Sequence, residues 1–166
     1  AGMFLATNGI GRHAFRFAAP DEPGYFGLAQ MQRNVMAVTG ACMLVRRELF
    51  ERLGGFDEAH QIVNNDLDFC LRVHKEGLLT VFTPYATLTH HELASRAGLK
   101  DVFNSAHFDT SWKTTFALGD PYFSPRLSRH SDDVRPDDEA VQWVTPGAPL
   151  FRAEDIKRIL VVKLDH

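Results

Sequence analysis

The segment NNDLDFCLRVHKEG, residues 64–77, constrains the fold more than any other part of the chain. When its residues are placed on a helix of 3.6 residues per turn, they separate into an apolar side and a charged side. The apolar side holds Leu67, Phe69, Cys70, Leu71 and Val73, and the charged side holds Asp68, Arg72, Lys75 and Glu76. Asn64 or Asn65 can cap the start and Gly77 can end the helix. We therefore expect an amphipathic helix that packs on a core through one face.

Strand patterns lie on both sides of this helix. The mostly apolar run at 34–47 predicts a central strand, and LLTVFTP and YATLTHHE predict two short strands around Pro84. RELFERL predicts a short helix that buries Leu49, Phe50 and Leu53 and ends at Gly54 and Gly55, followed by an exposed loop, FDEAHQIV. Strands alternating with helices are typical of α/β proteins, so we expect an incomplete mixed sheet with flanking helices.

The remaining segments complete this outline. Residues 98–118 predict a longer helix with an aromatic stripe of Phe108, Trp112 and Phe116. Residues 1–34 are rich in Gly and Pro and predict loops, and the Pro-, Ser- and Asp-rich stretch from Gly119 to about Asp155 predicts an extended tail. The apolar run Ile159–Leu164 is typical of a strand buried in a sheet that the chain does not go on to supply. These ends suggest a piece of a longer protein.

Composition excludes several classes of function. The 166 residues include 18 basic and 21 acidic side chains, and a net charge of −3 argues against nucleic acid as a partner. No apolar run is long enough to cross a membrane. The two cysteines, Cys42 and Cys70, lie in apolar runs, which suits a reducing, cytoplasmic environment better than a disulfide framework.

Two sites carry residues suited to chemistry. Asp66 falls on the apolar side at the first turn of the predicted helix, where it acts either as a helix cap or as a general base in a cleft. Asp68 and Arg72 are spaced as an ion pair, which is expected to be solvated. His90 and His91 follow a strand, so they point to opposite faces and at most one of them shares a cleft with Asp66.

Three motifs in order, AVTGACMLVRRELFERLGGFDE, NNDLDFCLRVHKEG and TPYATLTHHELASR, resemble the C-terminal half of the catalytic domain of family 2 glycosyltransferases. These are inverting enzymes with a GT-A fold. The resemblance is close over 34–96, and the tail DPYFSPRLS is similar to that of bacterial members that build cell-surface polysaccharide. It implies the acceptor-side half of a GT-A domain that transfers a sugar, of the hexosyl or deoxyhexosyl class, from a nucleotide sugar to a saccharide or glycolipid acceptor.

The resemblance also implies roles for single residues. Asp66 corresponds to the catalytic base, although Asn65 stands where many members have Glu. His90 corresponds to a histidine that helps to bind Mn²⁺ or Mg²⁺ on the donor diphosphate. Asp57 would contact the acceptor, and Asp68, Arg72, Thr39 and Gly40 would bind the acceptor or support its site.

Asp66 and Asp68 literally match the DxD metal motif of these enzymes. We reject that match, because the metal motif belongs at the end of a strand, whereas these two acids open a helix and face different ways. The donor site is therefore expected to lie outside the chain, and the isolated piece to be inactive. The last strand resembles the first strand of a GT-B heptosyltransferase. The predicted organisation is a GT-A part at 1–130, a linker at 131–155 and the start of a following domain at 156–166.

Two other readings stay open. One is a catalytically dead saccharide-binding or scaffold module with the same fold, which Asn65 and the missing donor half favour. The other is a histidine-rich metal-binding protein, although the eight histidines are scattered and only His90 and His91 are adjacent. A half domain also exposes a sheet edge, so we expect self-association or strand exchange. The resemblance places the protein in the cytoplasm, at the inner face of the bacterial membrane.

Overall fold

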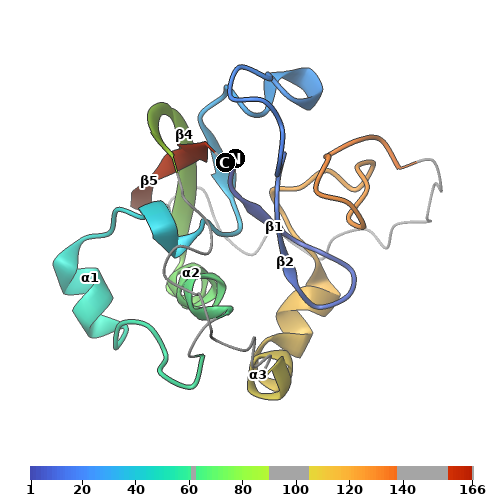
Figure 1. Ribbon diagram of the computed structural model, residues 1–166. Helices are drawn as coiled ribbons and strands as arrows, with labels where there is room; N and C mark the ends of the chain where they lie inside the picture. Colours follow the sequence, from blue (N-terminus) through green and yellow to red (C-terminus); the bar gives the residue numbers. More distant parts are fainter. Residues whose placement is uncertain (61–62, 90–104, 138–156, 166) are drawn as a thin grey trace, which may run out of the picture.

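The computed structural model describes residues 1–60, 63–89, 105–137 and 157–165 (Figure 1). It contains both helices and strands, in keeping with the α/β class that the sequence predicts. In chain order they are β1 (Met3–Leu5), β2 (Gly11–His13), the 3-10 turn η1 (Tyr25–Gly27), β3 (Arg33–Val35), the 3-10 turn η2 (Gly40–Cys42), α1 (Arg47–Arg52), α2 (Asn65–Lys75), β4 (Leu78–Thr89), α3 (Ser105–Leu118) and β5 (Lys157–Asp165).

The central element of the main sheet is β4. Strand β3 pairs with it antiparallel and β5 pairs with it parallel, which makes a mixed sheet of order β3-β4-β5. Strands β1 and β2 form a separate antiparallel pair. The predicted α/β class with an incomplete mixed sheet is confirmed. The last strand does not lack a partner, because β4 supplies one; the predicted domain boundaries at 130 and 155 stay a prediction.

Helix α2 forms where the sequence predicts it. Its five predicted apolar residues are all buried, and Gly77 follows its last turn with φ at +72°. Asn64 precedes the first turn, but its side chain makes no capping bond; the Asn65 Oδ1 instead accepts the Asp66 N–H at 2.8 Å. The predicted exposure of Asp68 is wrong, because only 4% of this residue is exposed. The side of α2 that was predicted to face solvent is therefore partly covered by the rest of the protein.

Helix α3 is what covers that side of α2. Phe108 and Trp112 are buried and Phe116 packs against the same core, so the predicted aromatic stripe is confirmed within 105–118, while 98–104 lie outside the described residues. The ammonium of Lys75 lies 4.0 Å from the centre of the Trp112 ring, which gives a cation–π contact between α2 and α3.

Two strand predictions need correction. The strand expected at 34–47 ends at Val35, because the chain turns into η2, where the Thr39 Oγ1 accepts the Ala41 N–H. The residues between them stay buried without belonging to a strand, which explains their apolar character. The two strands expected around Pro84 form one continuous strand with a register shift between Thr83 and Thr87. Proline has no N–H to donate to the ladder, so an irregularity there is expected.

The segment from Gly119 to Asp137 is not an extended tail. It folds against the N-terminal region, where Phe123 stacks on Phe4 with ring centres 4.1 Å apart, and Leu127 and Val134 join the same core. Arg12 in β2 and Asp132 form an ion pair at 3.0 Å. Residues 1–34 are mainly loops, as predicted. The short strands β1 and β2 in this region were not predicted. Within the described residues, no helix is both long enough and apolar enough to span a membrane.

Candidate functional site

Asp66 lies at the first turn of α2 and faces η2. Its Oδ2 accepts the Gly40 N–H at 2.9 Å, and its Oδ1 accepts the Leu67 N–H at 2.8 Å. Each carboxylate oxygen has about two acceptor positions, so these two bonds leave one on each oxygen. The carboxylate is half-buried and held in one orientation by two backbone groups. It is therefore fixed well enough to serve as a base and also contributes to the local structure.

Gly40 brings the backbone of η2 close to Asp66. A methyl group added at Gly40 would lie 3.4 Å from the Asp66 Cβ and 3.7 Å from the Phe56 ring, which are ordinary contact distances. Thr39 acts here as the cap of η2. The structure therefore places Thr39, Gly40 and Asp66 together, with the ring of Phe56 beside them. His90 lies outside the described residues.

Asp68 is the centre of a buried network on the other side of the same turn. Its Oδ2 accepts the Arg72 Nε–H at 2.8 Å, and its Oδ1 accepts the Trp112 Nε1–H at 2.8 Å. Arg72 also donates to the carbonyl oxygens of Leu53 and Gly55, at 2.6 and 2.7 Å. The predicted pair exists, but it is not a solvated one. The network of Asp68 and Arg72 joins the end of α1 to α2 and α3, and it therefore supports the local structure.

The two acids of the DLD motif do not form a metal site. Asp66 faces η2, and Asp68 binds Arg72 and Trp112 inside the protein, so their carboxylates are engaged in different places. A cation bound between them would have to displace the Arg72 guanidinium. The DLD motif therefore does not supply the site of the diphosphate-bound Mn²⁺ or Mg²⁺ of the family, and no reaction step is derived through that ion.

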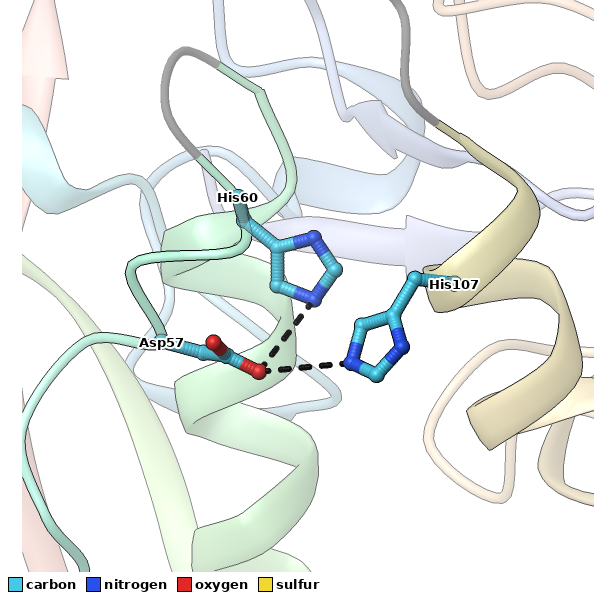
Figure 2. A group of neighbouring side chains, drawn as sticks. All are labelled: Asp57, His60 and His107. Carbon is cyan, nitrogen blue, oxygen red and sulfur yellow. Dashed lines mark ion pairs between the residues drawn. The ribbon is translucent and has the colours of Figure 1, made fainter.

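Asp57, His60 and His107 come together from two parts of the chain, and Figure 2 shows the three side chains converging. Asp57 and His60 belong to the loop after α1, and His107 belongs to the first turn of α3. The Asp57 Oδ2 lies 3.5 Å from the His107 Nε2 and 3.9 Å from the His60 Nε2. The Ala59 N–H bond, followed by the two histidines, lowers the pKa of Asp57, which keeps it ionised.

Sequence reasoning missed this cluster. It treated the loop at 56–63 as exposed, whereas His60 is buried, and it gave Asp57 only an acceptor-binding role. The three residues share no spacing motif, because His107 lies far along the chain, on α3. The DxxH spacing of Asp57 and His60 was the one available signal, and it is too common to be informative.

Comparison with known proteins gives the class. Residues 22–112 match the model described as "Glycosyltransferase like family 2". The O-antigen biosynthesis protein RfbC of Myxococcus xanthus is 34% identical over 95% of the chain, and the uncharacterized protein y4gI of Sinorhizobium fredii is 33% identical over 80%. The N-acetylglucosaminyl-diphospho-decaprenol L-rhamnosyltransferase of Mycobacterium tuberculosis is 40% identical over 41% of the chain and 22% of that protein.

The fold and the family match define the class, which is a partial GT-A-like domain of the glycosyltransferase type. The chain belongs to glycosyltransferase-like family 2. It spans 13% of the length of the Myxococcus relative and 15% of that of the Sinorhizobium relative. No solved structure matches the chain.

Proposed function

We propose that this chain is the acceptor-side part of an inverting glycosyltransferase and that Asp66 is its catalytic base. The observation that carries the proposal is the fixed carboxylate of Asp66 at the start of α2, within the segment that matches the family. The donor is a nucleotide sugar and the acceptor a saccharide or glycolipid. The transferred sugar is of the hexosyl or deoxyhexosyl class, in keeping with the name of the mycobacterial relative.

The chemistry asked of Asp66 is a proton transfer. The acceptor hydroxyl oxygen attacks the anomeric carbon, the bond from that carbon to the nucleoside diphosphate breaks, and the hydroxyl proton passes to Asp66. The proton leaves as the new bond forms, so position matters more than a high pKa of the base. The Gly40 and Leu67 N–H groups supply that position, and each oxygen keeps an acceptor site for the proton.

The rest of the proposal concerns parts that the described residues do not supply. His90 is proposed as a ligand of Mn²⁺ or Mg²⁺, together with acids from a donor site elsewhere in the complete protein. The isolated chain is expected to be inactive. A GT-B heptosyltransferase-like domain is proposed to begin with β5, and the protein is proposed to act in the cytoplasm at the inner face of the membrane. The free thiols of Cys42 and Cys70 suit a reducing compartment.

The alternative is a module that binds saccharide but transfers none. The bonds that Asp66 makes to Gly40 and Leu67 favour it to some degree, since a helix-start carboxylate also stabilises the fold. Measurements of sugar transfer and of glycan binding distinguish the enzyme from this module. The module binds a glycan but forms no new glycosidic bond.

The test is sugar transfer by the complete protein with a panel of nucleotide sugars and Mn²⁺. Asp66→Asn is compared with the wild type and with Asp133→Asn, a matched change at an exposed acid. We expect Asp66→Asn to lose at least roughly a hundredfold in rate and Asp133→Asn to keep the rate. Because Asn can replace only one of the two accepting oxygens, circular dichroism and melting temperature are measured for each variant.

If a folded Asp66→Asn protein transfers sugar at the wild-type rate, Asp66 is a structural residue and the base assignment fails. If the folded wild type transfers no sugar from any donor but binds glycan, the module without activity is the better account.

A further inference from the structure

The ligand atoms offered by Asp57, His60 and His107 all lie within 4.8 Å of one another. Around a tetrahedral Zn²⁺ with bonds of about 2.0–2.1 Å, neighbouring ligand atoms are roughly 3.4 Å apart. The Asp57 oxygen already lies 3.5 and 3.9 Å from the two imidazole nitrogens. The two distances to Asp57 are thus close to the tetrahedral spacing, and the largest separation, up to 4.8 Å, has to contract for the three residues to hold an ion.

The burial of His60 is independent evidence for a ligand. Its side chain is 1% exposed, yet among the described residues neither ring nitrogen has a hydrogen-bond partner. A buried polar group without a partner costs free energy, so such groups normally have one. Figure 2 shows the ring of His60 directed toward Asp57 and His107. A cation at that point would satisfy one of its nitrogens.

Neighbouring charge favours a cation there as well. The Oδ1 of Asp68 lies 3.9 Å from the same His60 nitrogen, on the inner side of the cluster. Asp57 and Asp68 thus place two carboxylates around His60, and the Arg72 guanidinium is engaged with the far oxygen of Asp68. Two carboxylates at this point attract a cation electrostatically.

We propose that Asp57, His60 and His107 bind a divalent transition-metal ion of the Zn²⁺ type. Two imidazoles and one carboxylate suit Zn²⁺ and its neighbours in the first transition series, whereas Mg²⁺ and Ca²⁺ prefer oxygen ligands alone. Three protein ligands leave a fourth position, which water takes on the solvent side, where His107 is 53% exposed. The site is separate from Asp66, whose carboxylate is bound to the Gly40 and Leu67 N–H groups.

The bound ion would connect the loop after α1 to the first turn of α3. Phe56 directly precedes Asp57, and its ring lies beside Gly40 and packs on Phe50 and Phe69. Fixing Asp57 would therefore also fix the loop that borders Asp66. This effect on the acceptor side, unlike the metal site itself, rests on the proposed function.

The experiment is calorimetric titration of the metal-free chain with Zn²⁺, with Co²⁺ as a second probe whose visible absorption reports its coordination. His107→Gln and Asp57→Asn are the test variants, because both side chains are partly exposed and Asn keeps the oxygen that accepts the Ala59 N–H. The controls are His130→Gln, another exposed histidine, and the double change His90→Gln with His91→Gln.

We expect one Zn²⁺ per chain, with affinity at least roughly tenfold lower in both test variants and unchanged in both controls. The proposal is overturned if the wild type binds no Zn²⁺, if His107→Gln binds as the wild type does, or if only the His90 and His91 change abolishes binding. No sugar is involved, so Asp66→Asn should bind Zn²⁺ normally even where the transferase proposal fails.

Discussion

Arg72→Lys tests whether the buried network around α2 supports the fold. Arg72 donates to the Asp68 carboxylate and to the carbonyls of Leu53 and Gly55, and its side chain is 23% exposed. Lysine keeps the positive charge, but its single ammonium cannot reach three acceptors placed for a planar guanidinium. At least two hydrogen bonds from a charged donor are then lost.

The cost follows from the value of those bonds. Hydrogen bonds to charged groups are worth about 1.5–3 kcal/mol, and the carbonyls of Leu53 and Gly55 are only partly buried, so water recovers some of this. We take about 1–1.5 kcal/mol for each lost bond, which lowers the free energy of unfolding by roughly 2–3 kcal/mol. The loop after α1 should also become more mobile, since Arg72 joins it to α2.

Urea unfolding, followed by far-ultraviolet circular dichroism and by tryptophan fluorescence, measures this loss. Trp112 is a direct reporter because its indole binds the same carboxylate. The matched control is Arg52→Lys, since Arg52 is 63% exposed and lies 3.8 Å from Glu76, a surface pair worth at most about 1 kcal/mol. Equal losses in the two variants would refute the view that Arg72 belongs to a buried network.

Two further predictions concern pH and association. Burial lowers the pKa of His74, whose Nε2 donates to the Met36 carbonyl, so the folded state takes up its proton less readily than the unfolded state, whose pKa is near 6.5. The stability advantage of the wild type over His74→Gln, measured in urea at pH 7.5 and pH 5, should therefore shrink on acidification, by at most about 1.4 kcal/mol per pH unit; a difference independent of pH would contradict this. Strand β5 pairs only with β4 among the described strands, so light scattering over a concentration series should show self-association, and a monomer at all concentrations would argue against it.

Helix α2 shows how far local sequence information reaches. Its bounds and its buried apolar side follow from a period of 3.6 residues, which depends only on backbone geometry. The same pattern predicted wrongly that Asp68 is exposed, because a helical wheel describes one helix alone and does not include a second helix that covers its charged side. Similarly, the apolar run at 34–47 indicated burial correctly for Val35 to Val38 but not for Leu44, which is 56% exposed, and most of the run is not a strand.

The sequence by itself determined the α/β class, helices α1 and α2, the aromatic stripe of α3 and the position of Asp66 at a helix start, because each of these depends on residues within about three turns of one another. Only the tertiary structure decided that Asp68 is buried against Trp112 and that Asp57 and His60 meet His107. Those contacts join residues 44 to 50 positions apart. They form because the aromatic stripe of α3 packs on α2, which also places the adjacent His107 near Asp57 and His60.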